Sequence, residues 1–295
     1  MTEIAVKAPA KINLTLKVCG LRSDGFHNIK SVMQKIDLTD EIFLRKTRQR
    51  IQLSCPDSSL PENEDNIAFK AARIFLKYSG LKNGVNIKLC KGIPTAAGLG
   101  GGSSDAAAVL MGLNKLFKTN LSLSALRKIG AELGADVPFF ITTGSSALAI
   151  GTGTTLKELP GAEDVWFVLV NPGFSVSTKW VYNNFRLTTA HKPDILSGYS
   201  KSGDMILLPE DITRLMRRAD TDFPFNDLET VTAERYPIIK DIKAKLLKSK
   251  AAAALMSGSG PTVFGIFANR QAAENCSKAC QTVYPWVISC ATWPV

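Results

Sequence analysis

The residues from Lys91 to Asp105 have the composition of a phosphate-binding loop. The segment reads KGIPTAAGLGGGSSD and contains five glycines, followed by two serines and an aspartate. Glycines let the backbone approach a ligand closely and adopt positive φ angles. The N–H groups at the start of a helix carry partial positive charge, which attracts phosphate. We therefore expect this segment to hold the phosphates of a nucleotide, with a flexible linker as the alternative.

Hydrophobic periodicity predicts the elements on either side of this loop. Between residues 85 and 90 apolar and polar side chains alternate, which indicates a strand. Apolar side chains recur at helical spacing from Ala106 to Phe117, and Ser103 or Ser104 is a plausible N-cap for that helix. Flexible linkers rarely join a regular strand directly to a regular helix, so we prefer the phosphate-binding interpretation.

The loop matches neither of two common phosphate-binding motifs. A Walker A loop requires a lysine after its last glycine, but Gly102 is followed by Ser103. A Rossmann fingerprint read from Gly98 would need a third glycine at position 103. The loop instead resembles the P-x-x-x-G-L-G-S/G-S-S loop of the GHMP kinases. The matching residues are Pro94, Gly98, Leu99, Gly100, Gly102, Ser103 and Ser104.

Other segments carry polar residues that could take part in chemistry. Lys11 and Asn13 are two residues apart on a predicted strand, so they share a face that could hold a hydroxyl or a phosphate. His27 follows a turn, and Asp136 precedes an apolar segment that contains a proline. Taken singly, Lys11 is typical of a surface lysine, His27 of a structural histidine and Asp136 of a turn residue.

The composition is that of a soluble globular protein with one large or two ordinary domains. The chain has 295 residues, of which 45% are apolar and 21% charged. No apolar run approaches the roughly 18 residues of a membrane helix, and the N-terminus lacks a signal-peptide core. We therefore expect a cytoplasmic protein without a membrane partner.

Cysteine spacing and charge restrict the possible ligands. None of the six cysteines forms a C-x-x-C pair and there are only two histidines, so a zinc site is not expected. Cys276 and Cys280 are expected to be buried thiols one helical turn apart. The net charge of +10 favours an anionic partner. Because lysines and arginines are spread along the chain, a nucleotide is preferred over nucleic acid.

The resemblance to the GHMP kinases extends over essentially the whole chain. Residues 9–14, the glycine loop and residues 257–265 match the family in order and spacing. The similarity is greatest to the branch that phosphorylates the 2-hydroxyl of diphosphocytidyl-methylerythritol in the non-mevalonate isoprenoid pathway. The segments that carry it are APAKINLTL from Ala8, RSDGFH from Arg22, EDN from Glu64, GLGGGSSD from Gly98, GADVPFF from Gly134 and NDLE from Asn226.

The resemblance implies an α+β fold of two domains. Residues 1–160 would form an ATP-binding domain similar to domain 2 of ribosomal protein S5, and residues 161–295 a ferredoxin-like domain. From the residue pattern, one helix is expected from about residue 226 to Lys248, and residues 188–222 are expected to form a variable surface excursion.

The resemblance also implies an ATP-dependent transfer of phosphate. Asp136 would accept the proton of the substrate hydroxyl, and Lys11 would stabilise negative charge and keep Asp136 ionised. Mg²⁺ would neutralise the β- and γ-phosphates, with Ser104 near the metal. Asn66 and Lys91 would contact the adenosine. The triphosphate would lie on Pro94, Thr95, Ala96, Ala97, Gly98, Leu99, Gly100, Gly101, Gly102, Ser103 and Ser104.

The substrate would be recognised by a further set of residues. By resemblance, Asn13 and Asp136 contact the methylerythritol, whereas Phe26, His27 and Tyr182 hold the cytosine. The family often has tyrosine at the position of Phe26, so a ring for stacking is kept and a hydroxyl is lost.

Three alternatives are considered beside this one. They are a GHMP kinase for mevalonate or homoserine, a non-catalytic regulator with the same fold, and a nucleic-acid-binding protein. The cytosine-binding residues argue against the first, and the intact lysine, aspartate and loop serines against the second. The spread of positive charge argues against the third. Either a monomer or a homodimer is compatible with the sequence.

Overall fold

The computed structural model describes residues 3–56, 58–162, 164–186 and 224–294. The segment 188–222 lies outside the described residues. The strands are β1 Glu3–Asn13, β2 Thr15–Leu21, β3 His27–Thr47, β4 Ile51–Ser54, β5 Gly84–Cys90, β6 Ser146–Gly151, β7 Thr155–Leu159, β8 Trp166–Asn171, β9 Phe225–Asn226, β10 Ala253–Met256, β11 Val263–Phe267 and β12 Trp286–Ala291. The helices are α1 Ile67–Tyr78, α2 Gly101–Phe117, α3 Leu123–Leu133, α4 Val137–Phe140, α5 Thr178–Asn184, α7 Asp227–Arg235, α8 Ile238–Lys248 and α9 Arg270–Gln281.

Two compact units make up the chain, and neither is continuous in sequence. The first contains residues 1–11, 37–95 and 100–143. The second contains residues 12–36, 96–99 and 144–295. β1, β3 and the glycine loop each contribute residues to both units, so the units do not test a single boundary in the sequence. The expected domain boundary near residue 160 therefore stays a prediction.

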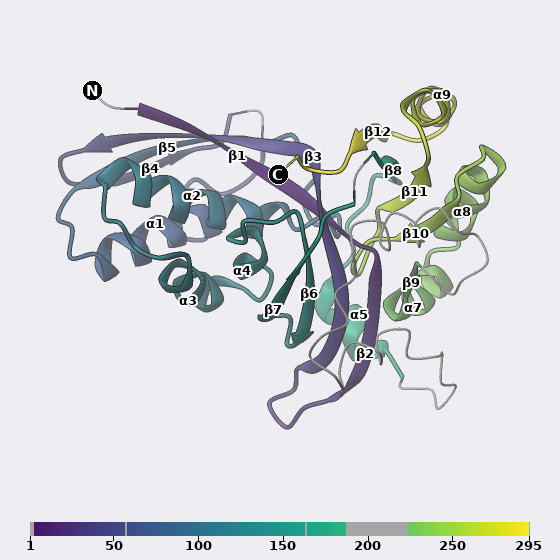
Figure 1. The fold of residues 1–295 in the computed structure, drawn as a ribbon, viewed down its shortest axis with the longest axis horizontal. Helices are drawn as coiled ribbons and strands as arrows, with labels where there is room; N and C mark the ends of the chain where they lie inside the picture. The colour runs from purple at the N-terminus through teal and green to yellow at the C-terminus, as the bar shows by residue number, and fades with distance from the viewer. Residues whose placement is uncertain (1–2, 57, 163, 187–223, 295) are drawn as a thin grey trace. The chain divides into compact units, whose positions relative to one another are not determined.

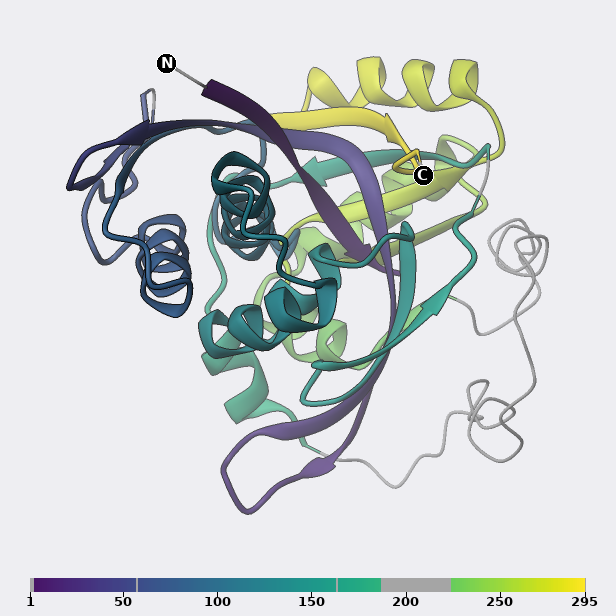
Figure 2. The ribbon, with the colours of Figure 1, turned by 60° about the vertical axis from the view of Figure 1, so that its left-hand side comes forward.

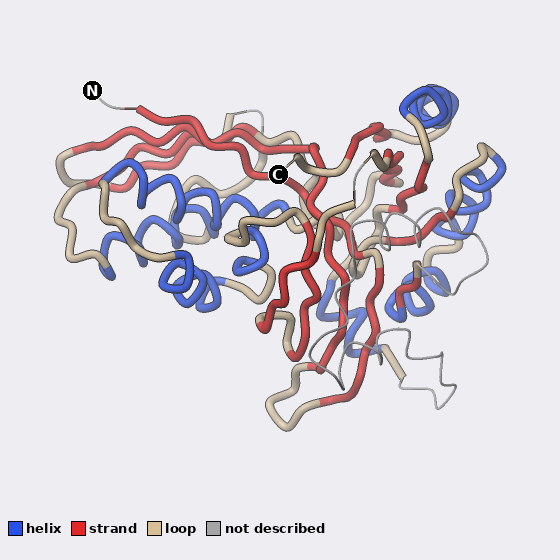
Figure 3. Tube along the Cα trace, in the orientation of Figure 1, coloured by secondary structure: helices blue, strands red, loops and turns tan. Residues whose placement is uncertain are grey.

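In the first unit, helices cover one face of a group of strands (Figure 3). β3 pairs antiparallel with β5, and β5 pairs in parallel with β4. Within β5, buried Val85, Ile87 and Leu89 alternate with more exposed side chains, so the predicted strand is confirmed. This alternation gives the sheet one apolar face, which is the face that the helices need.

Helices α1 and α2 lie side by side against these strands (Figure 1). The buried face of α1 consists of alanines together with Phe75 and Leu76. Gly112 of α2 lies against Leu44 of β3, and a Cβ atom there would be 2.4 Å from Leu44 Cδ1. The small residue therefore lets α2 pack closely on the sheet.

In the second unit, four antiparallel strands form a sheet in the order β10-β11-β8-β12. Helix α9 packs on this sheet, as Figure 2 shows, and α8 contacts β10 and β11. Strand–helix–strand repeats with this order form the ferredoxin-like arrangement. Buried side chains from the sheet and both helices make one apolar cluster, which includes Val168, Ile242 and Phe267. The α+β class expected from the sequence is confirmed.

Two details of the C-terminal region test the sequence analysis. The single helix expected up to Lys248 is wrong, because α7 ends at Arg235 and α8 begins at Ile238. Pro237 separates them, since proline lacks an N–H and is favoured only at the start of a helix. Cys276 and Cys280 are buried as predicted, with their sulfur atoms 4.0 Å apart. Within the described ranges, none of the helices is long and apolar enough to cross a membrane.

Candidate active site

The glycine loop leads directly into α2, which begins earlier than the sequence suggested. Its N-cap is Gly100, and Ser103 and Ser104 lie inside the first turn, so the prediction of a serine N-cap is wrong. Gly100 has φ +70°, a left-handed conformation that glycine adopts without strain. This conformation turns the chain into the helix, and Ser104 N donates to Gly100 O at 2.9 Å.

The start of α2 has the properties of an anion site. The first N–H groups of any helix lack intrahelical acceptors. Here the N-cap is glycine, so no N-cap side chain bonds them, and no acidic side chain lies in the first turn. Gly101, Gly102 and Ser103 therefore present N–H groups at the positive end of a long helix. Phosphate fits such a site by both charge and hydrogen bonding.

Lys11 of β1 packs against this turn. A Cβ atom on Gly100 would lie 3.0 Å from Lys11 Cγ and 3.0 Å from Phe140 Cζ. The absence of a side chain at Gly100 thus makes room for the stem of Lys11. The side chain of Lys11 is only 6% exposed.

Asp136 is the partner of Lys11. Lys11 Nζ lies 3.8 Å from Asp136 Oδ2, and the aspartate side chain remains 38% exposed. Asp136 is at the N-cap of α4, but its carboxylate makes no capping hydrogen bond, so it stays accessible to a ligand. Burial lowers the pKa of Lys11, and the charge and hydrogen bonding of Asp136 oppose that shift.

Ser104 is buried with an unsatisfied hydroxyl. Its side chain is 1% exposed, and its Oγ has no hydrogen-bond partner in the described part of the chain. A buried polar atom without a partner is costly, which suggests that it bonds a ligand.

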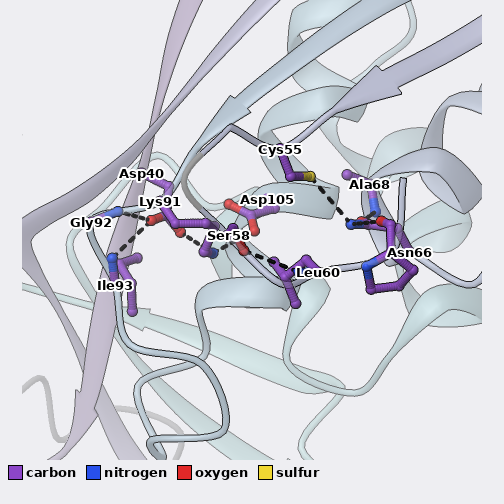
Figure 4. Close-up of polar contacts among 11 residues, drawn as sticks. Asp40, Cys55, Ser58, Leu60, Asn66, Ala68, Lys91, Gly92, Ile93 and Asp105 are labelled. Atoms are coloured by element: carbon purple, nitrogen blue, oxygen red, sulfur yellow. Dashed lines mark hydrogen bonds and ion pairs between the residues drawn. The ribbon is translucent and has the colours of Figure 1, made fainter. Parts of the chain in front are cut away.

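Lys91 lies between two buried aspartates (Figure 4), and its contact with the adenosine stays a prediction. Its ammonium bonds Asp40 and, at 2.7 Å, Asp105 Oδ2. Burial lowers the pKa of Lys91, but Asp105 and Asp40 more than compensate, so the net shift is upward. Burial also raises the pKa of Asp105 to about 8; Lys91 opposes that shift and Asp40 adds to it.

Asn66 has a clear local function. Its Oδ1 accepts from Ala68 N at 2.9 Å (Figure 4). Its Nδ2 donates to Pro61 O at 2.9 Å. Asn66 is therefore the N-cap of α1. An adenosine contact through the same amide stays a prediction.

In the second unit, Ser257 joins the middle of the glycine loop to the end of β1. Its hydroxyl donates to Gly98 O at 2.9 Å and accepts from Asn13 N at 3.4 Å. Gly98 has φ +79°, and a Cβ there would lie 2.2 Å from Ser257 O. Only glycine fits that position.

The amide of Asn13 is oriented by its neighbours. Asn13 Nδ2 donates to Ser31 Oγ at 2.7 Å, and Ser31 Oγ donates to Thr15 O at 2.6 Å. All three side chains are buried. Because Nδ2 must be the donor in this chain of bonds, the rotamer and flip of the amide are set.

The aromatic residues expected to hold a base occur in the second unit. The rings of His27 and Tyr182 are 5.2 Å apart at an interplanar angle of 32°. Phe26 is 66% exposed on the turn between β2 and β3, and its N–H donates to Asp24. An exposed ring beside a supported histidine offers a surface on which a base can stack.

The first unit thus brings Lys11, Asp136 and the start of α2 together, and the second brings His27 and Tyr182 together. Sequence analysis missed Asp40 and Ser257 as neighbours of the loop. Asp105 is the last residue of the GLGGGSSD segment, so the sequence could have indicated it as a neighbour of the loop. No local pattern, however, connects it to Asp40 in β3.

Comparisons with known proteins give the family. The family model for the N-terminal domain of GHMP kinases matches residues 66–144, and the model for the C-terminal domain matches residues 202–285. The 4-diphosphocytidyl-2-C-methyl-D-erythritol kinase of Geobacter metallireducens is 42% identical over 98% of both chains. That of Syntrophus aciditrophicus is 45% identical over 97% of this chain and 98% of its own. A crystal structure of 4-(cytidine 5'-diphospho)-2C-methyl-D-erythritol kinase superposes with a TM-score of 0.82 at 30% identity, covering 99% of this chain and all of the other.

Proposed function

Because this chain belongs to the GHMP kinases, we propose that it phosphorylates the 2-hydroxyl of 4-diphosphocytidyl-2-C-methyl-D-erythritol with ATP. It is a small-molecule kinase of the non-mevalonate isoprenoid pathway, and relatives named for this substrate match it almost end to end. The observation that carries the activity is the Lys11–Asp136 pair, whose lysine packs against Gly100 at the start of α2.

The loop from Pro94 to Ser104 holds the triphosphate of ATP in this proposal. The N–H groups of the first turn of α2 bond phosphate oxygens, and the helix dipole adds favourable charge. Gly98 and Gly100 keep the backbone free of side chains where the nucleotide approaches. The adenosine lies toward Asn66 and Lys91 by similarity to the family.

Asp136 and Lys11 act on the transferred group. The substrate oxygen forms a bond to the γ-phosphorus while the bond from that phosphorus to the β–γ bridging oxygen breaks, and ADP leaves. Asp136 takes the hydroxyl proton, and the ammonium of Lys11 stabilises the charge that develops on the oxygens. In a loose transition state little activation of the nucleophile is required, so a carboxylate is an adequate base.

The residues present fit a magnesium ion that travels with the nucleotide. Among the described residues, no group of three His, Cys, Asp or Glu side chains could hold a metal alone. Magnesium is commonly bound by one or two protein oxygens together with substrate phosphates, and the unsatisfied Ser104 Oγ is one such oxygen. When bound, the ion neutralises β- and γ-phosphate charge.

The diphosphocytidyl substrate is held by residues of β1–β3 and α5. Asn13 follows Lys11 by two residues on β1, and its oriented amide bonds the methylerythritol. Phe26 stacks on the cytosine, with His27 and Tyr182 completing the pocket for the base. These roles are supported by similarity to the family and by the His27–Tyr182 contact.

We also propose the organisation of the enzyme outside the site. Residues 1–160 form the ATP-binding sequence domain and residues 161–295 the C-terminal one; one matched range, 66–144, falls in the first and the other, 202–285, in the second. All six cysteines are free thiols, which supports a cytoplasmic enzyme. It acts as a monomer or a homodimer and needs no nucleic-acid or membrane partner.

An ADP-release assay tests the proposed activity. Purified protein with MgATP should release ADP when diphosphocytidyl-methylerythritol is added. Mevalonate and homoserine, offered at the same concentration, should release little more than the ATP-only control. Comparable turnover of either control substrate would place the chain in another branch of the family.

A further inference from the structure

Three charged side chains are buried together at the base of the glycine loop (Figure 4). The ammonium of Lys91 bonds one oxygen of Asp40 and, at 2.7 Å, one oxygen of Asp105. The Asp40 and Asp105 side chains are 0% and 3% exposed. Asp40 lies in β3, Lys91 directly follows β5, and Asp105 lies near the start of α2.

The two carboxylates have unequal surroundings. Asp40 Oδ1 accepts from Gly92 N at 2.7 Å and from Ile93 N at 2.8 Å, so Asp40 is satisfied by backbone as well as by Lys91. Asp105 bonds Lys91 through Oδ2, and its Oδ1 has no partner within the described ranges. One ammonium cannot balance two ionised buried carboxylates, and burial, opposed by Lys91 and reinforced by Asp40, raises the pKa of Asp105 to about 8. Lys91 and Asp40 alone would form a matched pair, so Asp105 is not needed for folding on charge grounds.

The place of Asp105 in the chain shows what it can do. Lys91 directly precedes the glycine loop, and Asp105 directly follows Ser104. Their bond therefore joins the two ends of the loop. Asp40 fixes the same end from the neighbouring strand, because it holds the N–H groups of Gly92 and Ile93. The ammonium also lies over the first turn of α2, since Lys91 Nζ is 3.4 Å from where a Cβ of Gly101 would be.

We propose that Asp105 is a positioning residue for ATP, which acts through Lys91 and Asp40 to hold the ends of the glycine loop and the first turn of α2 in the geometry that accepts the triphosphate. This inference rests on the proposed function. It also gives Lys91 a role within the protein: its ammonium bonds Asp40 and Asp105, and this role needs no contact with the nucleotide.

Substituting Asp105 distinguishes an effect on ATP binding from an effect on the stability of the fold. Asp105→Ala frees one end of the loop and leaves the matched Lys91–Asp40 pair, so the variant should fold. Its KM for ATP should rise about tenfold, because displaced N–H groups at the start of α2 bond the phosphates less well. The KM for the diphosphocytidyl substrate should stay within about twofold. Asp105→Asn keeps an oxygen that can accept from Lys91, so it should recover most of the affinity for ATP.

Lys243→Met is the matched control. Lys243 is paired with Glu229, which keeps its own bond to Met256 N at 2.8 Å in this variant. The change therefore removes a partly buried ion pair without freeing the backbone next to Ser257, whose hydroxyl bonds Gly98. This variant should lower the melting temperature and leave the KM for ATP unchanged.

Calorimetric binding of MgADP, measured beside the kinetics, distinguishes the possible failures. Binding of MgADP by the parent and tenfold weaker binding by Asp105→Ala would support the inference. Equal binding by the two proteins, or an equal rise of KM for both substrates, would overturn it and leave the proposed function in place. Failure of the parent itself to bind MgADP would overturn both.

Discussion

The ammonium of Lys11 lies 3.8 Å from the carboxylate of Asp136, and the two differ sharply in exposure. The lysine is buried under the first turn of α2, whereas the aspartate is accessible and does not cap α4. The buried ammonium places a positive charge beside the accessible carboxylate and gives that carboxylate a fixed direction. This arrangement suits a group that must accept a proton from a bound hydroxyl.

Replacing Asp136 by asparagine tests the proton acceptor. The change removes the charge and the basic oxygen at nearly constant volume, so kcat should fall at least about a hundredfold. Binding of MgATP, measured by calorimetry, should be retained because the loop is untouched. Turnover close to that of the parent would show that another group accepts the proton.

The pH dependence of kcat tests Lys11. Because burial lowers its pKa, the ammonium should be lost at a lower pH than that of an exposed lysine, which titrates near pH 10.4. The rate should therefore decline as the pH rises through this lowered pKa. Lys11→Arg, whose charge persists, should move the decline to higher pH. An alkaline limb at the same pH in both proteins would assign it to another group.

The same shift has a consequence for stability. Between the lowered pKa of Lys11 and about pH 10.4, the unfolded chain binds more protons at this site than the folded chain does. The contribution of Lys11 to the free energy of unfolding should therefore rise with pH across that window and be lost as the pH falls. Denaturant titrations of the parent and Lys11→Met at several alkaline pH values would measure this difference.

Gly100→Ala tests the close packing of the loop on Lys11. A methyl group at Gly100 would meet Lys11 Cγ and Phe140 Cζ at 3.0 Å and would also be strained by φ +70°. Gly151 has the same φ of +70° with nothing within 4 Å of the added atom, so Gly151→Ala carries the backbone strain alone. Each variant should lose about 1 kcal/mol of stability from that strain.

Only Gly100→Ala should affect catalysis, with kcat/KM for ATP lowered by at least about tenfold. Steady-state kinetics of the two alanine variants make the comparison. Similar losses in both variants would mean that backbone strain, rather than packing on Lys11, explains the effect.

Tyr182→Ala tests the recognition of cytosine. Stacking of a base on an aromatic ring contributes roughly 1–3 kcal/mol, so KM for the diphosphocytidyl substrate should rise about five- to a hundredfold. KM for ATP should change little, and Tyr182→Phe should be nearly silent. An equal weakening of both substrates would show that Tyr182 supports the fold through its contact with His27.

Local pattern was sufficient for the elements that carry the site. Each of β5 and α2 buries one face, so apolar residues recur at a regular spacing within a short stretch of sequence. That spacing is enough to predict both elements. The start of α2 was misplaced because Gly100 ends the loop by its backbone conformation, and a glycine-rich run does not show which glycine is left-handed. Pro237, in contrast, was a visible signal for the break between α7 and α8.

The pairing of residues distant in sequence could not be predicted in the same way. Asp40 is 51 residues before Lys91, and its bonds depend on the register of β3 against β5. Ser257 reaches Gly98 across 159 residues. Contacts between residues so far apart in sequence do not produce a regular spacing of apolar residues, so the sequence pattern cannot predict them. The roles of Lys11 and Asp136 were predicted from the resemblance to the family.

The phosphorus spectrum of the product tests the central claim most directly. The 2-hydroxyl of the methylerythritol unit is a tertiary alcohol, so its carbon carries no hydrogen. After reaction with MgATP, the proton-coupled phosphorus spectrum should show one new phosphomonoester signal without splitting by a neighbouring hydrogen, together with ADP in equal amount. A split monoester signal would place the phosphate on a primary or secondary hydroxyl, and ADP without a new monoester would mean that water is the acceptor; either result would contradict the account.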